Sequence, residues 1–112
     1  MNYSSLVPDR ELCEEMARLG ICQDKPEICY MNCQDDFNKS WILINGIPPV
    51  EHIIAPTLPR MLEELPSGYC VRKGWGGSKD WFVFNNEADV ITNLSEIPNA
   101  VAKALIKLEK KG

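Results

Sequence analysis

The chain of 112 residues contains a single histidine, His52, and no long apolar run. One histidine severely limits the Ser/His/Asp and Cys/His arrangements used by many nucleophilic enzymes. The Gly-x-Ser-x-Gly motif of α/β-hydrolases is also absent. No apolar segment approaches the roughly 20 residues that a membrane-spanning helix needs. These absences disfavour familiar hydrolase chemistry and a membrane protein.

Excess positive charge is missing too, since 16 Asp and Glu residues outnumber 12 Lys and Arg residues and the net charge is -4. This balance disfavours nonspecific binding to nucleic acid or to an anionic membrane surface. Residues 1–5 show no positive charge followed by an apolar stretch, so nothing indicates secretion. We therefore expect a soluble, cytoplasmic protein whose residues 1–112 form a single domain around one core.

The five cysteines are an odd number, and without a secretion signal a disulfide framework is the weaker interpretation. Cys13 and Cys70 fall in a predicted helix and a predicted strand, where free cysteine commonly behaves as a small buried hydrophobe. A zinc site formed by Cys22, Cys29 and Cys33 is an alternative, but only Cys29 and Cys33 have the spacing of a zinc knuckle. We expect reduced thiols, with no metal and no other cofactor.

Turn and cap residues divide the chain into three helices and two hairpins. Gly20 ends the first helix, because glycine adopts the left-handed conformation at low cost. Thr57 caps the second helix, and Pro66 prevents its continuation. The connector Ile47–Pro56 is apolar, and we expect it to lie extended along a sheet edge. The predicted elements are a helix from Pro8 or Asp9 to Leu19, strands at Glu27–Met31 and Ser40–Asn45, a helix at Thr57–Leu65, strands at Tyr69–Lys73 and Asp80–Asn85, and a final helix with Ile97, Val101, Ala104, Leu105 and Leu108 on one side.

Two of the predicted strands contain four adjacent aromatic and aliphatic residues, Trp41–Ile44 and Trp81–Phe84. Because successive side chains of a strand point to opposite faces, neither face of these strands is polar. We therefore predict that helices cover the sheet on both sides. The element order α-β-β-α-β-β-α indicates a compact α+β domain, with one mainly antiparallel sheet of about four strands and helices packed on its faces.

The turn of the second hairpin holds the candidate binding residues. Arg72, Lys73 and Lys79 combine positive charge with the aromatic ring of Trp75, on which a base could stack. Single-stranded nucleic acid is therefore one possible ligand, although Lys and Arg also commonly protect edge strands from pairing. Trp is enriched at interface hot spots, so a protein contact at Trp75 is the preferred interpretation.

Two segments carry a resemblance to a known group of proteins. Ala55–Pro66 is an Ala-Pro-Thr-led helix that ends in Leu-Pro before a hairpin, and Pro98–Leu105 begins an alanine-rich closing helix. This half of the chain resembles small phage and prophage-encoded proteins of the "ABA sandwich" type, although Ile97-Pro98 replaces their Asn-Pro. The resemblance implies a compact helix/sheet/helix fold, a bacterial or phage cytoplasmic setting and no established biochemical activity.

These features favour a small non-enzymatic accessory protein, which binds another protein or a second copy of itself through a strand edge or the Trp75 turn. The competing hypothesis is an enzyme or small-ligand-binding protein with a pocket around His52. That hypothesis requires a concave site with a carboxylate or a cysteine within hydrogen-bond reach of the histidine.

Overall fold

The computed structural model describes residues 6–24, 26–34, 39–74, 79–85 and 90–111. The described part of the chain contains three α-helices and six β-strands. In chain order the elements are α1 (Arg10–Leu19), β1 (Ile28–Gln34), β2 (Lys39–Asn45), β3 (His52–Ile54), α2 (Leu58–Glu64), β4 (Cys70–Lys73), β5 (Trp81–Phe84), β6 (Val90–Leu94) and α3 (Ile97–Lys111).

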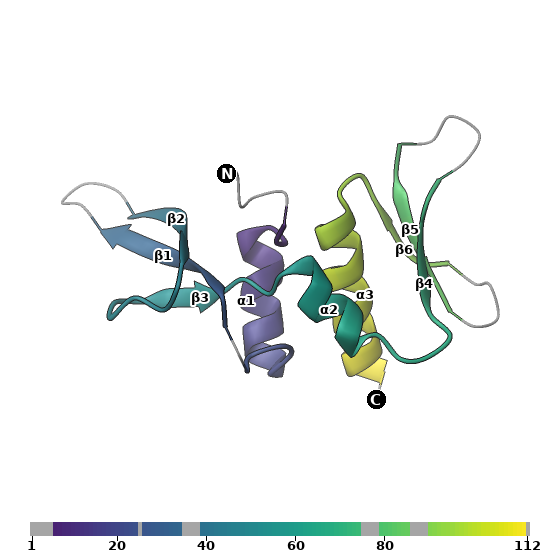
Figure 1. Ribbon diagram of the computed structural model, residues 1–112, viewed down its shortest axis with the longest axis horizontal. Helices are drawn as coiled ribbons and strands as arrows, with labels where there is room; N and C mark the ends of the chain where they lie inside the picture. Colours follow the sequence, from purple (N-terminus) through teal and green to yellow (C-terminus); the bar gives the residue numbers. More distant parts are fainter. Residues whose placement is uncertain (1–5, 25, 35–38, 75–78, 86–89, 112) are drawn as a thin grey trace.

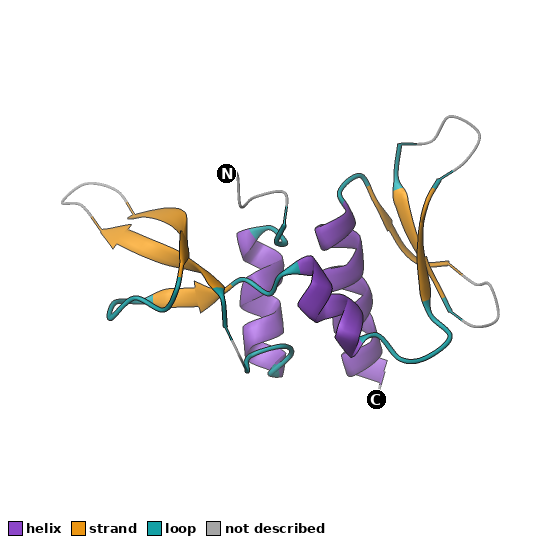
Figure 2. Cartoon of the chain, in the orientation of Figure 1, coloured by secondary structure: helices purple, strands orange, loops and turns teal. Residues whose placement is uncertain are grey.

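The strands form two antiparallel sheets of three strands each, with the helices between them. Sheet A has the order β2-β1-β3, and sheet B has the order β4-β5-β6. Figures 1 and 2 show α1 beside sheet A and α3 beside sheet B. The α+β class is confirmed, but one sheet of four strands covered by outer helices is not what the structure has. The layers are inverted, with sheets outside and helices inside.

Each sheet adds one strand to one of the two predicted hairpins. The expected connector does lie along a sheet edge, and its residues His52–Ile54 pair with β1 as β3. The strand β6 pairs with β5, with a register shift between Val83 and Phe84. With three residues, β3 is too short for a clear local pattern, and pairing with a neighbouring strand defines both added strands. The element order is therefore α-β-β-β-α-β-β-β-α.

The inverted layers follow from the burial of α3. Ala100, Val101, Ala102 and Ala104 are all fully buried, so the apolar surface of this helix extends well beyond one side. The helix packs against β5 and β6 of sheet B and also against α1 and α2. Because alanine side chains are small, α3 fits closely between its neighbours. A helix that is apolar around most of its circumference belongs in a middle layer.

Only one face of each aromatic strand is covered by helices. In β5, Val83 is fully buried and Trp81 packs against the same core. Phe82 and Phe84 lie on the other face, where their rings stack at 6.1 Å between centroids and 21° between planes. These two rings shield one another and stay half-buried. Aromatic side chains on one strand thus reduce water contact without a second helical layer.

The helix ends agree with the sequence signals. Gly20 has φ 75° and its N–H donates to the Ala17 carbonyl, while the N–H of Ile21 donates to the carbonyl of Met16. This pair of bonds closes the end of α1 in a Schellman-type arrangement. At the start of α2, the Thr57 hydroxyl accepts a hydrogen bond from the Arg60 N–H at 3.4 Å.

The segment before α1 links sheet A to the helical layer. The Tyr30 hydroxyl of sheet A donates to the Pro8 carbonyl at 2.8 Å, and the N–H of Asp9 donates to Oδ1 of Asn99 on α3 at 2.8 Å. The molecule is nevertheless elongated, with extents of 49 × 32 × 22 Å. Its radius of gyration is 14.9 Å, against about 13 Å for a compact domain of this length. Sheet A forms one end of the long axis (Figure 1).

Candidate functional site

The predicted binding residues of the second hairpin do not lie on one face. Arg72 pairs with Phe82 and Lys73 pairs with Trp81, and these adjacent residues of β4 point to opposite sides of sheet B. Arg72, Lys73 and Lys79 are all exposed. Trp75 lies outside the described residues, so its role in binding stays a prediction.

His52 has a backbone partner. Its Nδ1 lies 2.8 Å from the carbonyl oxygen of Val50, two residues earlier in the chain. The residue stands opposite Met31 in the β1–β3 pair, and it does not line any of three hollows formed by described residues. A close backbone carbonyl and a methionine neighbour favour a positional role for this imidazole over proton transfer to a bound molecule.

The cysteines are dispersed. Within the described ranges, no three His, Cys, Asp or Glu side chains converge as metal ligands would. Cys13 is fully buried, as predicted, and burial raises the pKa of its thiol to about 12. Cys70 is exposed, contrary to the prediction, because it begins the edge strand β4. Burial also raises the pKa of Cys22 to about 11, and it raises the pKa of Cys29. The side chain of Cys33 is outside the described set.

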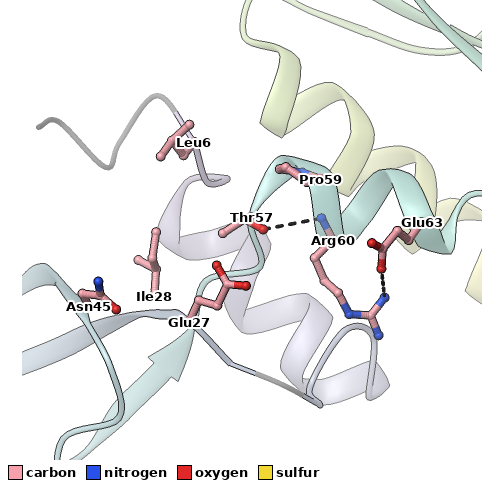
Figure 3. A pocket seen from close by; sticks show the side chains of 8 residues that line it. All are labelled: Leu6, Glu27, Ile28, Asn45, Thr57, Pro59, Arg60 and Glu63. Atoms are coloured by element: carbon pink, nitrogen blue, oxygen red, sulfur yellow. Dashed lines mark hydrogen bonds and ion pairs between the residues drawn. The ribbon is translucent and has the colours of Figure 1, made fainter.

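A hollow of about 540 Å³ lies between sheet A and α2 (Figure 3). Arg60 is the one basic residue among the described lining residues. Its guanidinium forms ion pairs with the carboxylates of Asp24, at 2.5 Å, and Glu64, at 2.6 Å. Hydrogen bonds to these carboxylates raise the pKa of the guanidinium. Glu63 approaches the same group at 4.0 Å. This ion-pair network links α2 to the segment between α1 and β1, where Asp24 lies, so among the described lining residues the hollow offers no unpaired cation to an anionic ligand. The other lining residues are Leu6, Glu27, Ile28, Asn45, Thr57 and Pro59.

The outer face of sheet A is almost entirely apolar. Its inner face packs against α1, because the Tyr30 hydroxyl reaches Pro8 and Ile28 joins the same buried cluster as Cys13. Alternation along the strands then places the neighbouring residues on the opposite, outer face. By register this outer face carries two cross-strand rows, Ile42–Met31–His52 and Ile44–Cys29–Ile54.

Exposed hydrophobic side chains concentrate at this end of the molecule. Of the five large hydrophobic residues that are exposed in the described part of the chain, the three most exposed are Ile42 at 45%, Ile47 at 59% and Val50 at 48%. Ile42 belongs to β2, and the other two belong to the connector between β2 and β3. We call these three side chains the β2–β3 surface. Single exposed hydrophobics are ordinary, but a group on one protruding sheet is typical of an interaction site.

Sequence reasoning missed this surface, although the pattern that forms it is visible. Residues 41–50 contain no charged residue, and within them the four residues Trp41–Ile44 predict cover on both faces. Helices cover the inner face alone, while on the outer face Cys29 is fully buried and Ile42 is open to solvent.

No protein-family model, no curated protein and no solved structure matched this chain. None of the helices in the described ranges has the length and apolar character that crossing a membrane requires.

Proposed function

We propose that this protein acts by binding another protein molecule through the β2–β3 surface. The observation that supports this most directly is the exposure of Ile42 on β2 and of Ile47 and Val50 in the connector between β2 and β3. Exposed apolar side chains lose contact with water when a partner covers them, which favours binding by roughly 25 cal/mol for each Å² removed from solvent. The proposal makes the protein an accessory or adaptor molecule. The phage or bacterial setting implied by the resemblance stays a prediction.

The location of the surface supports the same function. Sheet A lies at one end of an elongated molecule, away from the core that joins the helices to sheet B (Figure 2). A partner can therefore cover the β2–β3 surface without disturbing the helical layer. Its polar neighbours, Asn45 and Glu51, are exposed and form part of a rim, as in many protein interfaces.

The test uses a photo-crosslinking amino acid at position 47 in cells of the natural source. Position 62 on α2 is the matched control, because Leu62 is also exposed, at 41%, but belongs neither to sheet A nor to its connector. We expect a discrete crosslinked protein species from position 47 and none from position 62. Crosslinks from neither position, or the same pattern from both, would contradict the proposal.

A substitution provides the second measurement. Ile47→Asp places a charge in the centre of the proposed contact, and Leu62→Asp places the same charge on α2. With the crosslinker at position 50, we expect Ile47→Asp to reduce the crosslinked product at least tenfold and Leu62→Asp to leave it unchanged. Because both positions are exposed, the free energy of unfolding of each variant should lie within about 0.5 kcal/mol of that of the original protein. Equal crosslinking in the two variants contradicts the assignment.

A further inference from the structure

We propose that the partner is a second copy of this chain, which pairs antiparallel along the free edge of β2 and joins two copies of sheet A into one sheet of six strands. This inference rests on the proposed function, since it names the occupant of the β2–β3 surface. It is carried by a separate observation, the state of the four strand edges in the described sheets.

Three of those edges carry a feature that hinders pairing with another chain. The strand β3 is only three residues long. In β4, two of four residues are the exposed Arg72 and Lys73. In β6, Thr92 pairs with Val83 and Val90 pairs with Phe84, so one extra residue interrupts the ladder. Short length, charge and bulges are the usual means by which proteins protect sheet edges.

The edge of β2 has none of this protection. The strand pairs with β1 over seven residues in an unbroken register, from Gln34↔Lys39 to Ile28↔Asn45. Its only charged residue is the first, Lys39, and proline is absent from it. No other described strand pairs with its far side. An open edge of this length presents a row of backbone N–H and C=O groups to any extended segment that can complete the ladder.

A second copy matches this edge both in its backbone hydrogen-bonding groups and in its apolar outer face. Antiparallel pairing of a strand with itself is two-fold symmetric, so each copy supplies the donors and acceptors that the other lacks. The outer faces also continue across the junction, which brings Ile42 and Ile44 of one copy beside the same residues of the other. Since residues 40–45 contain no charge, the net charge of -4 adds no like-charged pair at the junction.

The size of the contact predicts how tightly the copies bind. A stable interface typically buries about 800 Å² on each partner. The edge of one seven-residue strand, with the exposed side chain of Ile42, makes a small interface by this measure. We therefore expect a reversible dimer whose population rises with protein concentration.

Amide hydrogen exchange of β2 measures the pairing directly. In the monomer, alternate backbone N–H groups of residues 41–45 point away from β1 and exchange quickly. We expect their exchange to slow at least tenfold between low and high micromolar concentration, while sedimentation equilibrium shows a mass approaching twice 12.7 kDa. A doubled mass with unchanged exchange in β2 would place the dimer elsewhere and overturn the inference.

The matched variants are Ile42→Lys, which adds an edge charge, and Leu62→Lys, which adds the same charge to α2. Ile42→Lys should weaken the dimer at least tenfold in sedimentation equilibrium, and Leu62→Lys should leave it unchanged. A dimer equally strong in both variants contradicts pairing through β2. The β2 exchange data on the original protein provide an independent test if Ile42→Lys fails to fold.

The two proposals fail in different ways. The protein could stay at 12.7 kDa at all concentrations and yet crosslink from position 47 to a protein of another mass. That outcome supports the binding surface and contradicts the second copy as its partner. A monomer that crosslinks to nothing loses both. A concentration-dependent dimer with protected β2 amides supports both.

Discussion

At the scale of single residues, burial separates the thiols into two classes. Cys13, Cys22 and Cys29 are buried, and desolvation raises the pKa of each. Cys70 is exposed at the edge of sheet B. Because the thiolate is the reactive form, the buried thiols are protected both by lack of access and by a low thiolate fraction at neutral pH.

We therefore expect iodoacetamide at pH 7.5 to modify Cys70 at least tenfold faster than Cys13, Cys22 or Cys29. Peptide mass mapping of a labelling time course under reducing conditions measures the four rates. In 6 M urea the rates should converge, which provides the control. Equal rates without urea would contradict the buried positions of the three thiols.

Another residue-scale contact joins a sheet to a helix. The Thr92 hydroxyl of β6 is buried and donates to the Ala100 carbonyl of α3 at 2.8 Å. Thr92→Val keeps the shape of the side chain and removes this hydrogen bond, and we expect a loss of about 1 kcal/mol in the free energy of unfolding. Thr92→Ser is the matched control, because it keeps the hydroxyl. Urea unfolding measures both, and an unchanged midpoint for Thr92→Val would argue against the bond.

At the scale of elements, α3 is the layer on which the fold depends. Its exposed residues include Lys103 and Lys107, four positions apart, while residues 100–102 and 104–106 are buried. The helix also carries polar links at its margin, where Lys107 donates to the Ile91 carbonyl and Lys110 pairs with Glu15 of α1. Hydrogen bonding to Lys110 lowers the pKa of Glu15.

Close packing of α3 predicts an asymmetric response to larger side chains. Ala102 is fully buried, so Ala102→Leu adds three carbons to a closely packed site. The variant should lose about 1 to 3 kcal/mol in the free energy of unfolding. Lys103→Leu adds an apolar side chain at the adjacent exposed position and should change it by less than about 0.5 kcal/mol. Urea unfolding distinguishes the two. Similar values for both variants would contradict the central position of the helix.

At the scale of the whole molecule, groups buried around α1 link stability to alkaline pH. Desolvation raises the pKa of Cys13 to about 12 from 9.0 and that of Cys22 to about 11 from 9.0. It also raises the pKa of Tyr30 to about 12 from 10.0. Above these ordinary values the unfolded chain loses protons that the folded protein keeps. The stabilisation is therefore complete below about pH 9 and declines as the pH rises toward the folded values.

We expect the urea midpoint to be constant from pH 7.5 to 8.5 and to fall steadily from pH 9 to 11, under reducing conditions. Each fully shifted group contributes at most about 1.4 kcal/mol per pH unit. Cys13→Ala removes one such group, so its decline should be shallower than that of the original protein. A midpoint that does not change up to pH 11 would contradict the burial of these groups.

The local parts of the fold were predictable because neighbouring residues determine them. Gly20 and Thr57 act within a turn of helix, and the structure confirms each. The candidate site was not predictable in the same way. The sequence shows that residues 41–50 carry no charge. It contains no local signal for which side chains of β2 face α1 and which face solvent.

The sequence by itself determined the helices, most of the strands and the α+β class, since periodicity, caps and turns are short-range effects. Only the tertiary structure decided the order of the layers, the pairing of β3 and β6, and the exposure of Ile42. The physical reason is that several elements here are apolar on more than one side. Such elements can each pack against several neighbours, and the packing of the whole chain around α3 decides which faces are buried.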